Sequence, residues 1–318
     1  MPPAILRPWP KMSWVKTMPM DYHNPVLLNE AVGGLDIKND GVYVDVTFGG
    51  GGHSQAILNH LNNGKLIAFD QDKAALENII LDDRFSLTRQ NFRNIQNVIE
   101  ATTSIRPSGV LADLGVSSFQ FDCPERGFSF RFNNRLDMRM NTNSDLDAYK
   151  LLKDYDEQQL ENVFRQFGDF KIVESKKLST AIINSRSHSP LETTFQLASV
   201  VEHLVPKKIR NQFLARVFQS IRIEVNQELS ALSDFLIQLP KVLKKCGVIC
   251  VITYHSLEDR LVKYFIREGK FEGNAESDLY GNKNLPFKKV GGLIIPSEKE
   301  VKLNNRSRSG KLRIAERI

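Results

Sequence analysis

Short apolar segments alternate with helical segments in the first third of the chain. Runs rich in β-branched and aromatic residues at 42–48, 66–70, 85–88 and 110–113 predict strands. The segments between them carry helical patterns, at 53–60, 73–81 and 92–101. Strands separated by helices of this length predict an α/β fold with a parallel sheet and right-handed crossovers.

The middle of the chain has no clear strand pattern. Helices are expected to begin at Ser144 and Asp156, which are good N-cap residues, to cover 171–186, and to begin again near Thr193. A further single helix is expected from an apolar stripe at helical spacing, formed by Ile221, Val225, Leu229, Leu232 and Leu236.

The strand pattern resumes near the C-terminus. Residues 248–254 are nearly all apolar, as in a buried parallel strand, and a helix is expected from Ser256. Residues 290–295 and 311–315 are expected to close the sheet edge as a hairpin-like pair. A helical block therefore interrupts one Rossmann-like α/β domain.

This pattern predicts four segments. They are a flexible extension (1–20), the first part of the α/β domain (21–122), an inserted helical substrate-recognition domain (123–225), and the second part of the α/β domain with a basic tail (226–318).

Composition narrows the class of protein. The chain has 318 residues, 41% hydrophobic and 25% charged, which is an ordinary globular mixture. It contains no apolar run of about 18 residues, so no membrane span is expected. Cys123, Cys246 and Cys250 lack metal-ligand spacing and are expected to be reduced and mostly buried. We therefore expect a cytoplasmic protein without a metal site; its oligomeric state, a homodimer included, stays open.

Positive charge gathers near the C-terminus. The net charge is +6, and Arg306, Arg308 and Lys311 stand among Ser and Asn residues. Such a cluster suits contacts with RNA phosphates. The alternative is a solvated terminal strand.

A glycine-rich turn carries the strongest chemical signal. The motif DVTFGGGGH at 45–53 joins a strand to a helix, and the next strand ends at Asp70, where an acidic residue can bind ribose hydroxyls. Nicotinamide cofactors and S-adenosylmethionine both fit this outline. The irregular glycine spacing favours S-adenosylmethionine, and Asp45 and Asp113 are expected to place negative charge near its ammonium and sulfonium.

The chain also resembles a known family, the bacterial small-subunit ribosomal RNA methyltransferases called MraW or RsmH, from about Tyr22 to Arg317. The matching blocks are HNPVLL (23–28), DVTFGGGGHS (45–54), DLGVSS (113–118), RGFSF (126–130), LDMRM (136–140), FQSIRI (218–223), VNQEL (225–229), HSLEDR (255–260) and NRSRS (305–309).

The resemblance implies methylation of N4 of a decoding-centre cytidine, cytidine 1402 of 16S rRNA, in the assembled small ribosomal subunit. It implies S-adenosylmethionine as cofactor, with contacts at Gly51, Gly52, His53, Asp70, Phe92, Asp113 and Gln120.

Two residues are candidates for the chemistry. Asp113 ends an apolar strand and can accept a hydrogen bond from the target amine. His255 follows another strand and either faces the same cleft or caps a helix. The phenylalanines of the segment 128–132 either stack on RNA or pack the inserted domain. A nicotinamide-dependent oxidoreductase and a non-catalytic RNA-binding protein remain the alternative functions.

Overall fold

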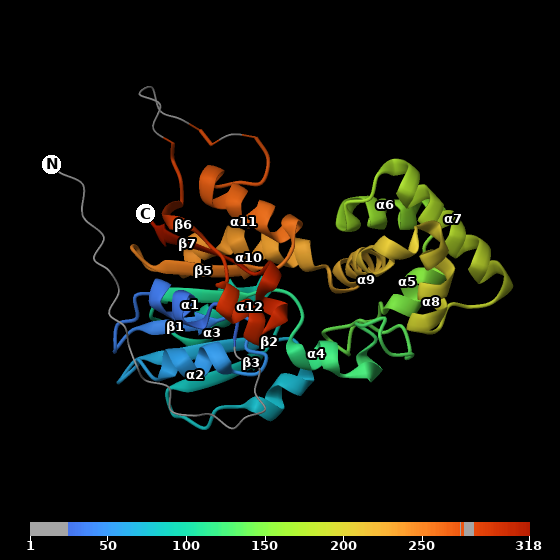
Figure 1. Cartoon of the computed structure of the whole chain (residues 1–318). Coiled ribbons are helices and arrows are strands. Elements are labelled where there is room, and N and C mark those ends of the chain that lie inside the picture. The colour runs from blue at the N-terminus through green and yellow to red at the C-terminus, as the bar shows by residue number, and fades with distance from the viewer. Residues whose placement is uncertain (1–24, 274, 277–282) are drawn as a thin grey trace.

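The computed structural model describes residues 25–273, 275–276 and 283–318, so the expected extension at 1–20 lies outside the described residues. The α/β prediction is confirmed by a seven-stranded sheet of order β3-β2-β1-β4-β5-β7-β6 (Figure 1). Strands β1 to β5 pair in parallel, and β7 runs antiparallel to both of its neighbours. The strands are β1 (Val42–Asp45), β2 (Lys65–Asp70), β3 (Phe85–Arg89), β4 (Gly109–Asp113), β5 (Val248–Thr253), β6 (Phe287–Ile294) and β7 (Lys311–Arg317).

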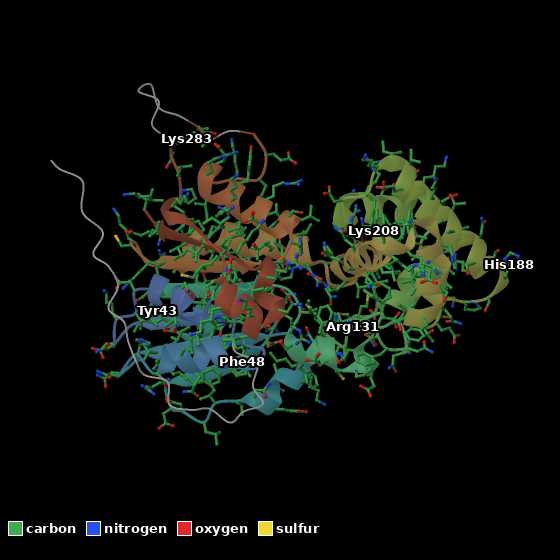
Figure 2. All side chains as sticks on the ribbon, viewed as in Figure 1. Tyr43, Phe48, Arg131, His188, Lys208 and Lys283 are labelled. Atoms are coloured by element: carbon green, nitrogen blue, oxygen red, sulfur yellow. The ribbon has the colours of Figure 1, made fainter. Side chains whose placement is uncertain are left out.

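Helices cover both faces of this sheet. Alternate side chains of β1 and β4, such as Val44 and Val110, join a core with helices α3 (Ile95–Thr102), α10 (Glu228–Val242) and α11 (Ser256–Glu268). The side chains between them, such as Tyr43 (labelled in Figure 2) and Leu111, join a second core with α1 (Leu28–Gly34) and α2 (Gly52–Leu58). Burial on both faces explains why the strands are nearly continuous apolar runs.

A group of helices with its own apolar core lies beside the sheet, at the right of Figure 1. Asp156 and Thr193 cap helices as predicted, but the helix expected from Ser144 begins after Asp147, whose carboxylate accepts a 2.7 Å bond from the Lys150 amide. The helices of this group are α5 (Ala148–Asp154), α6 (Glu157–Gly168), α7 (Ile172–His188), α8 (Thr194–Val201) and α9 (Arg210–Asn226).

The described residues also form shorter helices and 3₁₀ turns. The segment expected as a helix at 73–81 is a 3₁₀ turn, η1. The others are α4 (Ser118–Asp122), α12 (Glu298–Leu303), η1 (Lys73–Asn78), η2 (Phe92–Asn94), η3 (Pro124–Arg126), η4 (Glu202–Leu204), η5 (Lys207–Ile209) and η6 (Asn305–Ser309).

The single helix predicted from the apolar stripe is wrong. Gln227 adopts a left-handed conformation with φ of 49° and ends α9 before α10 begins. Ile221 and Val225 therefore pack in the helical group, whereas Leu232 and Leu236 pack against the sheet. The helical period continues across the break, so the pattern alone did not reveal the change of direction.

The C-terminal segment is not a solvated strand. β7 lies between β5 and β6 and pairs antiparallel with β6 at the edge of the sheet, as expected, although α12 and η6 separate the two strands along the chain. Of the three cysteines only Cys250 is buried, contrary to expectation. Among the described helices, none combines the length and the apolar character needed to cross a membrane.

Candidate functional site

The strand order reverses between β1 and β4, because β2 and β3 extend the sheet on one side and β5 on the other. Ligands of open α/β sheets bind at the carboxyl ends of the strands beside such a switch point. Asp45 ends β1, Asp70 ends β2 and Asp113 ends β4. The topology thus brings together the three carboxylates that the sequence singled out.

Glycine is required in this turn for packing as well as for access of a ligand to the backbone. Gly51 is the N-cap of α2 with φ of 79°, and a side chain there would press on the Phe48 ring at 3.0 Å. A Cβ at Gly52 would lie 2.3 Å from Pro25 Cγ, so this glycine allows Pro25 to pack against the turn. Both residues are where the prediction requires, and cofactor contact by either stays a prediction.

Asp45 is buried at the end of β1. Its side chain is fully buried, and it accepts hydrogen bonds from the Ser54 hydroxyl at 2.7 Å and from the Thr47 amide at 3.1 Å. Burial raises the pKa of this carboxyl, and the hydrogen bonds oppose that shift. The carboxylate therefore stabilises the turn through Ser54 and Thr47. That it places negative charge near a ligand cation stays a prediction.

Asp70 links the end of β2 to the glycine turn. Its two oxygens accept from the amides of Gly49 and Asp72, each at 2.8 Å. Burial raises its pKa to about 6 despite these bonds. The carboxylate is held in a fixed orientation, and each oxygen keeps a lone pair for ribose hydroxyls.

Asp113 has partners on both sides. The Tyr254 hydroxyl donates to Oδ1 at 2.7 Å, and His53 Nδ1 lies 3.7 Å from Oδ2. The side chain is 22% exposed, and burial raises its pKa to about 6. The His53 ring is anchored because Nε2 lies 3.1 Å from the Val26 carbonyl, which can only accept, so Nε2 carries the proton.

Tyr254 is a site residue that sequence reasoning missed. β5 pairs with β4 so that Ile252 stands opposite Asp113, and Tyr254 follows just beyond the end of β5. Its pKa is raised well above the ordinary value by burial and by the neighbouring Asp113, so it stays a neutral donor. The parallel register of the two neighbouring strands is the signal that would have found it.

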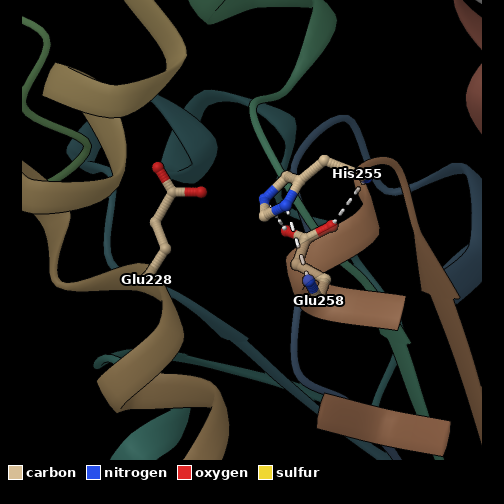
Figure 3. A group of neighbouring side chains, drawn as sticks. All are labelled: Glu228, His255 and Glu258. Atoms are coloured by element: carbon tan, nitrogen blue, oxygen red, sulfur yellow. Dashed lines mark hydrogen bonds and ion pairs between the residues drawn. The ribbon is translucent and has the colours of Figure 1, made fainter. Parts of the chain in front are cut away.

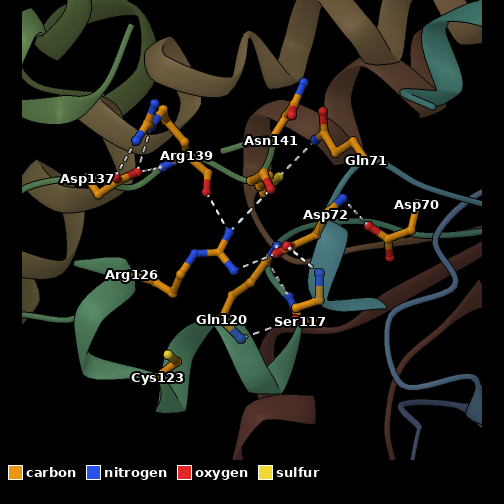
Figure 4. A network of polar contacts seen from close by, with 12 residues as sticks. Asp70, Gln71, Asp72, Ser117, Gln120, Cys123, Arg126, Asp137, Arg139 and Asn141 are labelled. Atoms are coloured by element: carbon orange, nitrogen blue, oxygen red, sulfur yellow. Dashed lines mark hydrogen bonds and ion pairs between the residues drawn. The ribbon is translucent and has the colours of Figure 1, made fainter. Parts of the chain in front are cut away.

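A polar network connects the residues that follow β2 to the start of the helical group (Figure 4). Gln120 is buried, and its Nε2 donates to Asp72 Oδ2 at 2.7 Å. Arg126 Nη1 reaches the same oxygen at 2.7 Å, while its Nη2 donates to the Arg139 carbonyl at 2.7 Å. Asp72 and Arg126 were not predicted. Gln120, expected as a cofactor contact, bonds Asp72, and the Asp72 amide donates to Asp70.

Phe92 follows β3 at the start of η2, as the resemblance requires. Its ring is partly buried against the sheet core and meets Phe235 edge-on at 5.5 Å between ring centroids. This contact fixes the position of the ring; a contact with adenine stays a prediction.

His255 caps a helix, which was one of its two expected roles. It is the N-cap of α11, its Nδ1 accepts from the Glu258 amide at 3.4 Å, and its Nε2 lies 3.1 Å from Glu258 Oε1 without the geometry of a hydrogen bond (Figure 3). Glu228 stands on the other side of the ring, and its two oxygens accept bonds from Arg222 at 2.8 Å each.

The ligand atoms of Glu228, His255 and Glu258 lie within 4.8 Å of one another, close enough to bind one metal ion. The Arg222 guanidinium already neutralises Glu228 there and would repel a divalent cation. These contacts do not test whether the protein binds a metal ion, so the expectation of no metal site stays a prediction.

The predicted RNA-binding residues differ in their surroundings. Arg306 pairs with Asp122, with Nη1 3.0 Å from Oδ2, and Lys311 lies 3.6 Å from Asp259. Arg308 is exposed on η6. Within the segment 128–132, Phe128 and Phe130 pack in the core of the helical group, and Phe132 is exposed.

Comparisons with known proteins identify the family of this chain. The model of the MraW methylase family matches residues 20–318. The chain is 54% identical to "Ribosomal RNA small subunit methyltransferase H" of Flavobacterium johnsoniae, over 95% of this chain and 100% of that protein. It is 47% identical to the protein of the same name from Bacteroides thetaiotaomicron, over 94% and 98%.

A solved structure of an rRNA methylase from Streptococcus thermophilus is 12% identical, with a TM-score of 0.39 over 94% of this chain and 99% of that chain. On the match to nearly its whole length, the chain belongs to the MraW methylase family.

Proposed function

We propose that this chain transfers a methyl group from S-adenosylmethionine to the exocyclic N4 of a cytidine in 16S rRNA, cytidine 1402 of the decoding centre. The observation that carries the chemistry is the Asp113 carboxylate, which is partly accessible at the switch point and held by Tyr254 at 2.7 Å. Membership of a methylase family and relatives named as small-subunit rRNA methyltransferases support the reaction class and the substrate.

The cofactor would lie over the carboxyl ends of β1, β2 and β4. Asp70 would bind its ribose, the backbone at Gly51, Gly52 and His53 its methionine part, and Phe92 its adenine; Gln120 would hold its place through Asp72. S-adenosylmethionine supplies an electrophilic methyl group on sulfur.

The chain's task is to orient a weak nucleophile, because the N4 lone pair is delocalised into the cytosine ring. Asp113 would accept a hydrogen bond from the amine, raise its nucleophilicity and take up the proton that leaves as the new bond forms. Tyr254 keeps one oxygen of Asp113 engaged, so that the other oxygen has a defined direction. Alignment of nitrogen, methyl and sulfur would supply much of the remaining acceleration.

The target base must leave its stack to reach such a site. We assign the choice of substrate to the helical segment 123–225, acting on the assembled small subunit in the cytoplasm, with Arg306, Arg308 and Lys311 near the RNA backbone. Arg308 is the most available of the three, because the other two have carboxylate neighbours.

The decisive experiment maps labelled methyl groups on small-subunit RNA from a strain that lacks the protein. Addition of purified enzyme and S-adenosylmethionine should label N4 of one cytidine; label at another base or none would refute the proposal. Calorimetry with S-adenosylmethionine and with NAD separates this function from an oxidoreductase, since only one of the two should bind. A non-catalytic RNA-binding protein would transfer no label.

A further inference from the structure

Helix α4 exposes two phenylalanine rings beside the candidate site. Phe119 is 52% exposed and Phe121 is 39% exposed, whereas Gln120 between them is 5% exposed. Two large apolar side chains left in water on one five-residue helix suggest a surface that another molecule covers.

The position of α4 is fixed by the candidate cofactor site itself. Its N-cap, Ser117, lies against the glycine turn, where a Cβ at Gly49 would be 3.7 Å from Ser117 Cβ. Its inward residue, Gln120, bonds Asp72, whose amide bonds Asp70. The rings are therefore carried by a helix that is hydrogen-bonded to the candidate site and begins five residues after Asp113.

Positive charge accompanies these rings. The Arg306 guanidinium stands over the Phe121 ring at 5.9 Å from the ring centroid, and its ion pair with Asp122 holds it there. The Arg306 side chain is still 38% exposed, and Arg308 is exposed close by on the same 3₁₀ turn. Apolar rings flanked by guanidinium groups complement a nucleotide, which has a flat apolar base and an anionic phosphate.

We infer that Phe121 and Arg306 form a stacking subsite for an unpaired nucleotide next to the target cytidine. The base lies on the Phe121 ring, and Arg306, kept in place by Asp122, meets its phosphate or the edge of the base. When the target base leaves its stack, the neighbouring bases lose a stacking contact. An aromatic ring beside the pocket can replace that contact for one of them. This inference rests on the proposed function, because it places the subsite beside the methylated base.

The test uses the full-length protein and a single-stranded RNA with one cytidine next to 2-aminopurine, a base whose fluorescence falls when it stacks. Phe121→Leu keeps apolar bulk but removes the flat ring. This variant should weaken RNA binding about tenfold, within the range for loss of one stacked base, and reduce the quenching of 2-aminopurine. Phe121→Trp should restore both.

A matched control removes another ring that an arginine covers. Tyr264 lies under Arg267 at 4.9 Å on α11, well away from α4 in Figure 1. Tyr264→Leu should leave RNA affinity and quenching at the wild-type values.

S-adenosylmethionine affinity, measured by calorimetry on each variant, separates stacking from damage to α4. Retained cofactor affinity with weaker RNA binding supports the subsite. Parallel loss of both, or unchanged RNA affinity and quenching, overturns it. A change in self-association or protein binding with RNA binding intact also overturns it, since the rings would then serve a protein contact. Methylation of the small subunit by the wild-type enzyme tests the proposed function separately, because the stacking signal requires no methyl transfer.

Discussion

Replacement of Asp113 by Asn tests the proposed chemistry most directly. The amide has the shape of the carboxylate, and its oxygen can still accept from the Tyr254 hydroxyl, now at 2.7 Å. Its NH₂ group would face His53 Nδ1, which lies 3.7 Å from the present Oδ2 and has a free lone pair if Nε2 donates to Val26. The variant therefore loses the charge and the ability to take a proton with little change in packing.

The size of the effect follows from what is lost. A hydrogen bond to a charged acceptor contributes about 1.5–3 kcal/mol, which corresponds to roughly 10- to 150-fold in rate if it acts on the transition state. Proton uptake by a positioned base adds about 10²- to 10⁴-fold. Single-turnover transfer of labelled methyl to the small subunit, at saturating cofactor, should thus fall at least a hundredfold. Cofactor affinity should fall much less, because the loss concerns the chemical step.

The same substitution should stabilise the fold. Burial raises the Asp113 pKa from 3.8 to about 6, so the folded state binds the proton more tightly than the unfolded state does. Stability is therefore lost as pH rises between about 4 and 6, on the order of 3 kcal/mol at neutral pH. Asn has no such cost, and Tm at pH 7 should rise for Asp113→Asn. A variant with wild-type single-turnover rate would refute a chemical role for Asp113, and His255 would be the next residue to test.

Three further outcomes are expected. Asp70→Ala should weaken S-adenosylmethionine binding by about 1.5–3 kcal/mol in calorimetry, and unchanged affinity would remove Asp70 from the site. The single-turnover rate of the wild type should fall as pH is lowered through about 6, because the acceptor is the ionised form of Asp113; Tyr254→Phe should move this inflection to higher pH, since the lost hydrogen bond favours the ionised form. Arg308→Ala should reduce the slope of log RNA affinity against log salt by about 0.7–0.9, and Arg306→Ala and Lys311→Ala by less; equal slopes in all three variants would contradict the distinction between paired and free cations.

The local sequence pattern was sufficient to predict the strands and the acidic residues at their ends. Each central strand is buried on both faces, which leaves an unbroken apolar run in the sequence, and the residue after the run is placed at the edge where ligands bind. Asp70 and Asp113 were found in this way. Asp45 follows the same rule, yet its carboxylate is fully buried and accepts hydrogen bonds from Ser54 and Thr47.

What local pattern could not show depends on contacts between distant segments. Gln227 has no turn signature, so the apolar stripe predicted one helix across the left-handed break between α9 and α10, even though the expected boundary between segments lay at 225/226. Arg126 meets Asp72 only because the chain returns to the sheet edge after β4. The C-terminal cations were interpreted as a basic tail. Arg313 instead lies in strand β7 of the sheet, and its Nε donates to Asp259 Oδ1 of α11 at 2.7 Å.

The blocks of sequence that carry the family resemblance meet in space, which explains why they occur together. The segment HNPVLL contributes Pro25, which packs on Gly52, and Val26, which accepts from His53 of the glycine block. The block after β4 meets the one after β5 where Tyr254, just before HSLEDR, bonds Asp113.

The remaining blocks join the two parts of the molecule. The Asn226 side chain at the end of α9 donates to the Met138 carbonyl and accepts from the Met140 amide, each at 2.7 Å. Arg126 bonds the carbonyl of Arg139 from the same LDMRM segment and pairs with Asp72 beside Asp70. Both passages of the chain between the helical group and the sheet are thus bonded to one segment, and Arg126 links that segment to Asp72 after β2. Gly52, His53 and His255 each have a structural role in this framework, so only substitutions that separate ligand affinity from stability can assign them a further role in cofactor binding or catalysis.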